Sequence, residues 1–221
     1  MHSMRLGIGG LSINRPDSPA VKKQVQEAER ANANHKVQGI TDFMSGSHLK
    51  GWNTDYDRVQ VGKGKRAYTA AREFVKTWQH MGLGWVDTNR PEVKVGEHVI
   101  VMAQVLGLLW MCNPLRIVYA REEKAYMPAT ALLKASRQPA CTRKGMRYDF
   151  RQTTLEGHSL AGEERFSVQW CKEDDSVWYE IYAVSRPATI LALASYPLTR
   201  YYQRRFRQES IAAVCDAVDT S

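Results

Sequence analysis

The stretch from Tyr148 to Phe206 decides the fold, because strand patterns give way there to a helical one. Its four segments read Y-D-F-R-Q-T-T-L-E-G-H from 148, G-E-E-R-F-S-V-Q-W-C from 162, V-W-Y-E-I-Y-A-V-S-R-P from 177 and Y-P-L-T-R-Y-Y-Q-R-R-F from 196. Apolar and polar residues alternate in the first three segments, as they do in half-buried strands. The predicted strands span 148–155, 166–171 and 177–184. In the fourth segment Leu198, Tyr202 and Phe206 recur every four residues, which predicts a long helix from 197 to about 218.

The rest of the chain adds strands and one strong helix. An apolar face recurring every three or four residues predicts a helix at 65–81, and a second, mostly polar helix is expected at 19–32. Further strands are predicted at 53–61, 85–88, 99–105 and 115–120. The connections are too short for parallel crossovers, so the strands should be antiparallel. This order predicts an α+β fold in which a curved antiparallel sheet wraps around the long C-terminal helix.

Domain organisation follows from the same pattern. We expect an N-terminal arm and surface helix over 1–50, and one main domain over 51–221. Residues 124–147 contain many Lys and Arg residues and no acid, so they are interpreted as a basic insertion between two strands, with a short helix at 129–136. The insertion is either a solvated loop or a docking element for an anionic partner.

The C-terminal helix carries a second group of basic residues, which could meet an anionic partner or simply face solvent. The candidate contacts with an anionic partner are Lys134, Arg137, Arg143, Lys144, Arg200, Arg204 and Arg205. The net charge of +8 suits such a partner, or a basic surface without one. The aromatic RNP signature of RNA-binding domains is absent, so nucleic acid is not expected.

Bulk composition limits the remaining classes. With 221 residues, 43% of them hydrophobic, the chain can bury a sizeable core and is not intrinsically disordered. Its longest apolar run is too short to span a membrane as a helix. The cysteines, Cys112, Cys141, Cys171 and Cys215, are widely spaced, so free thiols in a reducing intracellular compartment are expected, and an organelle such as a chloroplast or mitochondrion is compatible.

Catalytic chemistry has few candidates. The segment Gly62-Lys63-Gly64-Lys65 is followed by Arg66 where a phosphate loop needs Ser or Thr. His158, Glu163 and Glu164 could act as acid and base, but their Gly-containing segment is interpreted as a joint between strands, where they serve caps and turns. No enzyme activity, metal or cofactor is therefore expected.

Aromatic residues in the strands and the last helix could fill a core or line a pocket. The candidates for a ligand cavity are Trp170, Trp178, Tyr179, Tyr202 and Phe206. Both interpretations stay open from the residues alone, because large aromatic side chains dominate cores and ligand pockets alike.

The order of G-H…G-E-E-R-F, V-W-Y-E-I, S-R-P and Q-R-R-F, with D-Y-D-R-V-Q-V-G-K-G at 55–64, resembles uncharacterised protein family 0548. The resemblance covers roughly residues 36–215. It implies a helix-grip fold akin to pollen-allergen and steroid-transfer domains, which often hold a hydrophobic ligand between sheet and helix. It carries over no catalytic residue. The insertion and the N-terminal arm depart from the family.

Three functional hypotheses follow. The first is a non-enzymatic domain that binds a hydrophobic small molecule or lipid between sheet and helix. The second is an accessory subunit of a larger, organellar assembly, docked through the basic insertion and the N-terminal arm. The third, an envelope-membrane channel, is implied by the resemblance alone, and about seven short strands do not fit a single-chain barrel.

Overall fold

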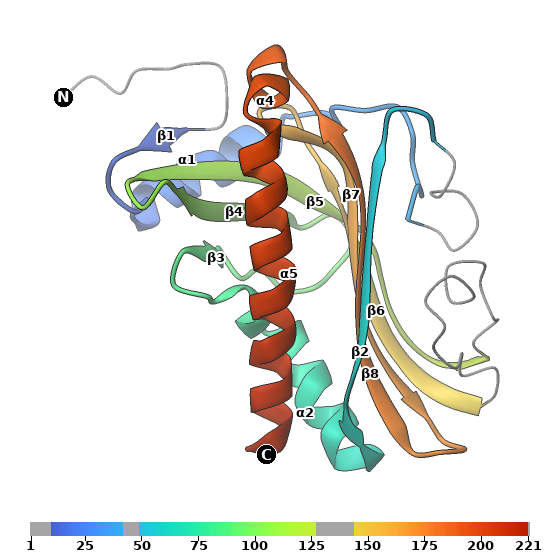
Figure 1. The fold of residues 1–221 in the computed structure, drawn as a ribbon. Coiled ribbons are helices and arrows are strands. Elements are labelled where there is room, and N and C mark those ends of the chain that lie inside the picture. The colour runs from blue at the N-terminus through green and yellow to red at the C-terminus, as the bar shows by residue number, and fades with distance from the viewer. Residues whose placement is uncertain (1–9, 42–48, 127–143, 221) are drawn as a thin grey trace.

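A computed structural model describes residues 10–41, 49–126 and 144–220. Its centre is an antiparallel sheet in the order β2-β8-β7-β6-β5-β4-β3, with β1 paired to β5. The strands are β1 (Leu11–Ser12), β2 (Asn53–Lys63), β3 (Val86–Thr88), β4 (His98–Val105), β5 (Leu109–Tyr126), β6 (Lys144–Thr154), β7 (Leu160–Cys171) and β8 (Ser176–Pro187). The sheet curls around one long helix, as predicted (Figure 1).

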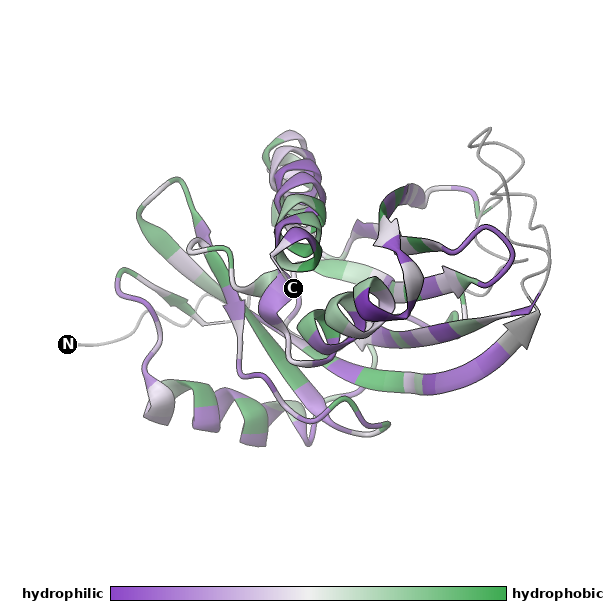
Figure 2. Ribbon diagram, turned by 90° about the horizontal axis from the view of Figure 1, so that it is seen from below, coloured by the Kyte–Doolittle hydropathy of each residue, from purple (hydrophilic) through white to green (hydrophobic). Residues whose placement is uncertain are grey.

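That helix is α5 (Tyr196–Asp219), which stands along the concave side of the sheet. Pro197 lies at its start, where a residue without an N–H costs nothing. The short α4 (Ile190–Ala194) precedes it, and α2 (Gly64–Lys76) packs beside its C-terminal half. Viewed along its axis, α5 lies on one side of the sheet and α1 (Ser18–Ala28) on the other (Figure 2).

The main core fills the space between the sheet and the C-terminal half of α5. Phe150, Phe166 and Tyr179 from the strands meet Trp78 and Val214 there, all essentially without solvent exposure. The rings pack edge-on, with the Trp78 and Phe150 centroids 5.1 Å apart. This end of the sheet is closed, so any ligand space must lie toward α4.

Two helices end earlier than their patterns predict. The predicted helix at 65–81 ends at Lys76, because Trp78 adopts a left-handed backbone with φ of 62°, and a 3₁₀ turn, η2 (Gln79–Met81), follows. The predicted helix at 19–32 ends at Ala28. It packs on the outer face of β4 and β5 through a small cluster around Ile100 and Trp110, rather than standing free.

Several strands are longer than predicted, which corrects two interpretations. β5 and β6 extend into the predicted basic insertion, so its described ends, up to residue 126 and from residue 144, are paired strands. The middle of the insertion, with its expected helix at 129–136, lies outside the described residues. β7 begins at Leu160, so the segment taken as a joint is part of a strand.

Among the cysteines that the structure describes, one differs from the expectation. Cys112 and Cys215 carry free thiols, as predicted. Cys171, at the end of β7, is disulfide-bonded. Pairing depends on Cα separation in the folded chain, which the spacing of cysteines along the sequence does not report.

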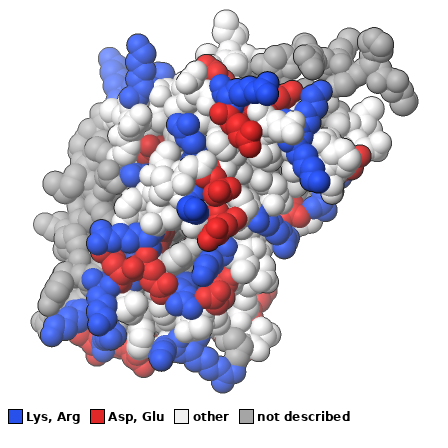
Figure 3. Space-filling model, turned by 180° about the vertical axis from the view of Figure 1, so that it is seen from behind, with Lys and Arg blue, Asp and Glu red and all other residues white. Residues whose placement is uncertain are grey.

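Charges on the described surface are mixed in sign. Lys and Arg side chains lie interspersed with Asp and Glu on the face seen in Figure 3. Ion pairs also recur among the described residues, for example between Arg72 and Glu122 at 2.8 Å. The net charge of +8 therefore does not gather into one basic field on this face. Within the described part of the chain, no helix is long and apolar enough to cross a bilayer.

Candidate functional site

A cavity of about 540 Å³ lies between the concave face of the sheet and the N-terminal half of α5. Its walls come from β3 to β8, α4, α5 and the hairpin tip between β4 and β5. Most of the wall is apolar, including Trp85, Val101, Leu109, Leu198 and Phe206. Ligand pockets typically enclose about 300–1,000 Å³ with mostly apolar walls and a few placed polar groups. The cavity fits that description.

Side-chain size along the strands explains why the cavity begins where it does. The inward positions of β6, β7 and β8 pair across the sheet in layers. The closed layer is Phe150, Phe166 and Ile181. The next layer toward α4 is Gln152, Glu164 and Ala183, followed by Gly162 and Ser185. Large apolar side chains thus give way to smaller or polar ones on three neighbouring strands, and the space that this leaves faces α5.

The helix closes the cavity with two aromatic residues that the sequence singled out. Tyr202 and Phe206 both line it. The Tyr202 hydroxyl accepts a hydrogen bond from the backbone N–H of Leu106 at 2.7 Å, which ties α5 to the hairpin tip. Its ring lies 5.4 Å from that of Trp85. Phe206 contacts Phe166 edge-on at 6.3 Å and so marks the floor between cavity and core.

The other three aromatic candidates lie away from the cavity, which corrects the prediction for them. Tyr179 is buried in the closed core, where its hydroxyl lies 3.0 Å from Ser210 Oγ. Trp178, one residue before it, points to the opposite face of the sheet, with the Arg58 guanidinium 3.9 Å above its ring. Trp170 sits at the closed end, stacked on Tyr68 at 6.0 Å.

Glu164 is one of three ionisable groups on the polar part of the wall, with His158 and Glu163. Gln152, which is fully buried, donates a hydrogen bond from Nε2 to the Glu164 carboxyl at 3.2 Å. Burial raises the pKa of Glu164 to about 7, and nearby Asp55 pushes in the same direction, while Gln152 and Arg207 oppose them. The carboxyl can therefore hold or release a proton near neutral pH.

The neighbours of Glu164 in the sequence serve structural purposes. Glu163 points to the outer face, where it accepts hydrogen bonds from Gly39 N at 2.9 Å and from Thr41. His158 lines the cavity rim and accepts from the Leu160 N–H at Nδ1, at 2.9 Å. Burial lowers the pKa of His158 to about 4, so it is neutral at physiological pH. The turn interpretation holds for His158, but it is wrong for Glu164.

The seven residues predicted to contact an anionic partner fall into three groups: those in ion pairs, those exposed to solvent, and those outside the described residues. Arg200 pairs with Asp55 across to β2, with Nη2 2.6 Å from Oδ1. Arg205 pairs with Glu209 at 2.6 Å and covers the Trp85 ring. Arg204 and Lys144 are exposed. The remaining three, Lys134, Arg137 and Arg143, lie outside the described residues.

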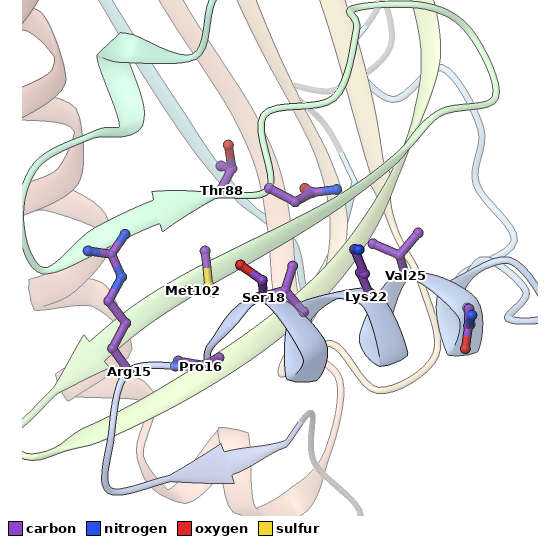
Figure 4. Close-up of a pocket in the computed structure, with 10 residues that line it drawn as sticks. Arg15, Pro16, Ser18, Lys22, Val25, Thr88 and Met102 are labelled. Carbon is purple, nitrogen blue, oxygen red and sulfur yellow. The ribbon is translucent and has the colours of Figure 1, made fainter.

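A second hollow lies on the outer side of the sheet, between α1 and the strands β3 and β4 (Figure 4). It measures about 610 Å³ and is an open groove rather than an enclosed space. Arg15 at one end is already paired with Asp87 at 2.5 Å, and Lys22 is exposed to solvent. Neither hollow offers a metal site, because the described residues hold no group of three His, Cys, Asp or Glu side chains placed as ligands.

Comparison with known proteins gives matches over nearly the whole chain. The domain of unknown function DUF1990 matches residues 38–213. A UPF0548 protein from Arabidopsis thaliana is 30% identical over 221 residues, covering 96% of this chain and 98% of the relative. A UPF0548 protein from Dictyostelium discoideum is 26% identical, covering 95% and 96%.

Solved structures with a similar layout have little sequence in common with the chain. Ara h 8.0201 aligns with a TM-score of 0.45 and 11% identity, over 77% of this chain and 100% of its own. Norcoclaurine synthase from Thalictrum flavum aligns with a TM-score of 0.41 and 9% identity, over 84% of this chain and 92% of its own.

Proposed function

The chain belongs to the UPF0548 family, whose members carry the DUF1990 domain, and we propose that it is a non-enzymatic protein that binds a hydrophobic small molecule between sheet and α5. The observation that carries the proposal is the cavity of about 540 Å³ with its largely apolar wall. Apolar surface removed from water contributes roughly 25 cal/mol per Å². An apolar ligand in this space would gain that contribution wherever it covers the apolar wall.

The polar groups of the wall support binding rather than catalysis. Ser159 donates its hydroxyl to Asn113 Oδ1 at 3.2 Å, and Ser185 accepts from Gln203 at 3.2 Å. The Nδ1 atom of His158 is engaged by the backbone. Among the described lining residues, therefore, no serine stands in hydrogen-bond contact with a histidine, the arrangement that an activated nucleophile needs.

The proposal is tested by titrating the protein with Nile red, a neutral apolar dye whose emission rises in apolar surroundings. We expect one dye molecule per chain. Ala103 lies on the cavity wall, so Ala103→Phe should fill part of the space and weaken dye binding by roughly tenfold or more. Ala212→Phe, on the exposed side of α5, adds the same ring outside the cavity and is the matched control.

Two outcomes would count against the proposal. The wild-type chain could fail to bind the dye in a saturable way. Alternatively, Ala103→Phe and Ala212→Phe could bind it equally well, which would place the dye elsewhere on the protein.

A further inference from the structure

We propose that the cavity is selective for an apolar ligand bearing a protonated amine, and that Glu164 pairs with that amine. The inference rests on the proposed binding function and names its ligand class. It stands on the charge of the cavity wall and on the position of one carboxyl group.

The charge of the wall is opposite to that of the protein. The chain has 31 Lys and Arg residues against 23 Asp and Glu. Among the described residues that line the cavity there is no Lys and no Arg, whereas Glu163 and Glu164 are both present. Glu163 directs its carboxylate to the outer face of the sheet. Glu164 is therefore the acidic group available to a ligand.

Within the described residues, Glu164 forms no ion pair with a Lys or Arg side chain. Among the described residues, its one hydrogen bond is the 3.2 Å contact from Gln152 Nε2. Arg207 on α5 is close enough to lower its pKa, but the Arg207 guanidinium is held by Asp55 on β2 at 3.1 Å and by Asp57. Tyr179 on β8 is engaged with Ser210.

An ammonium group would supply the positive charge and the N–H donors that the Glu164 carboxylate lacks among the described residues. A desolvated carboxylate is costly unless it is paired, and a charge-assisted N–H···O⁻ bond is about twice as strong as a neutral one. Gln152 Oε1, a buried acceptor on the side chain that holds Glu164, also has no hydrogen-bond partner among the described residues. An ammonium has three N–H donors, enough for the carboxylate and a second acceptor.

Other head groups fit less well. A carboxylate or phosphate would enter a wall without Lys or Arg and would be repelled by ionised Glu164. A neutral alcohol brings one donor and no charge, so it gains a weaker hydrogen bond. The apolar tail is common to all three, which makes the head group the discriminating variable.

The preference should depend on pH. Glu164 titrates near pH 7 because of its burial, with Arg207 and Asp55 as the charged neighbours and Tyr179 un-ionised in this range. An alkylamine, with a pKa near that of Lys at about 10.4, stays protonated. Affinity for the amine should therefore rise between about pH 6 and pH 8, as Glu164 ionises, while affinity for a fatty acid should fall.

The test compares decylamine, decanol and decanoic acid as competitors of Nile red at about pH 8, using the whole chain. We expect decylamine to bind roughly tenfold more tightly than the other two. Glu164→Gln should remove that preference, so that the three competitors displace the dye with affinities within about twofold of one another. Glu29→Gln, an exposed change at the residue that follows α1, is the charge-matched control and should keep the preference.

The outcomes separate this inference from the function on which it rests. Equal affinity for the three competitors, or tighter binding of decanoic acid, overturns the amine preference while dye binding upholds the cavity. An amine preference that survives Glu164→Gln overturns the role of Glu164. Should that variant not fold, the order of the three competitors on the wild-type chain still decides. Absence of dye binding overturns both proposals.

Discussion

His80 is a fully buried imidazole among aromatic rings, with the Phe166 centroid at 4.7 Å and the Trp78 centroid at 6.0 Å. Neither ring nitrogen has a hydrogen-bond partner among the described residues. Burial lowers the pKa of His80 to about 3. The folded state therefore keeps this ring neutral, and protonation of the unfolded chain below its normal pKa favours unfolding.

The expected consequence is acid sensitivity. Stability contributed by neutral His80 is complete above about pH 6.5 and is lost as the pH falls toward 3, by about 2 kcal/mol at pH 5. His80→Phe should remove this part of the change in unfolding free energy with pH, whatever the substitution itself costs in packing. Urea unfolding at pH 7 and pH 5 measures it. Equal slopes in both proteins would mean that His80 is not held neutral.

Glu164 should act on stability in the opposite direction. Its folded pKa, raised to about 7, lies above the unfolded value of 4.5, so the folded state holds the proton more tightly. Stability is then lost as the pH rises between these values, by an amount on the order of 1–3 kcal/mol. Glu164→Gln should be the more stable protein at pH 8 and show no such advantage near pH 4. Matching unfolding midpoints at pH 8 would contradict a desolvated carboxyl group.

Single residues show how far alternation along the sequence can predict a site. Tyr202 and Phe206 follow from helical spacing alone, because one stripe of an amphipathic helix must face the sheet. Trp178 and Tyr179 could not both face a cavity, since neighbouring strand residues point to opposite faces. Gln152 was not identified from the sequence, and Glu164 was interpreted as part of a joint between strands. A polar residue at an inward position of two adjacent strands was the available signal.

At the scale of elements, α5 is held to the sheet by a cluster of ion pairs. Asp55 on β2 accepts from Arg200 and Arg207, and only 6% of its side chain is exposed. Asp55→Asn keeps the shape but leaves two guanidinium groups underpaired, so we expect a loss of about 2 kcal/mol.

A less buried carboxylate that also pairs with two arginines provides the control for this prediction. Asp87→Asn weakens the contacts with Arg15 and Arg90, whose side chains are 51% and 47% exposed, and should cost less than about 1 kcal/mol. Urea unfolding measures both variants. Equal losses would show that the Asp55 cluster does not anchor α5.

Gly62 lies where β2, α2 and α5 meet, at a register shift in the pairing of β2 with β8. A Cβ atom there would approach Val218 Cγ1 to 2.8 Å and Ala67 Cβ to 2.9 Å. Gly62→Ala should therefore push α5 outward and destabilise the chain by roughly 1–3 kcal/mol.

Gly10 gives the comparison, because the nearest atom to its Cβ would be Gln24 Nε2 at an ordinary 3.5 Å. Gly10→Ala should change the thermal midpoint little, since surface substitutions usually stay within about 0.5 kcal/mol. A Gly62→Ala protein as stable as Gly10→Ala would refute close packing at this junction.

The presence of each strand or helix was easier to predict from the sequence than the residues at which it begins and ends. The hairpin of β7 and β8 follows from alternation around an acidic turn, but β7 starts earlier than predicted because Gly162 suggested a joint. A backbone ladder can continue through glycine when neighbouring strands supply the hydrogen bonds, and one sequence does not show those neighbours. Helix α2 ends at Lys76, earlier than predicted, because Trp78 adopts a left-handed backbone that no local sequence pattern indicates.

The whole molecule divides into a closed end and an open end. The aromatic core, α2 and the C-terminal half of α5 close one end, while α4, the hairpin tip and the start of α5 surround the cavity. Several apolar side chains at the open end, including Leu106 and Leu191, are more than half exposed. The fold class was predictable from element order, but the cavity was not, because it arises from side-chain sizes on three paired strands.

Hydrogen exchange measured with and without decylamine tests most directly whether the sheet–helix cavity holds an apolar ligand. The account predicts slower exchange around the β4–β5 tip and in α4 and the first half of α5, with α2 unchanged, because ligand binding stabilises the parts it contacts. Protection confined to α1 and residues 15–18, which border the outer groove, would contradict it. So would no change at all at saturating ligand.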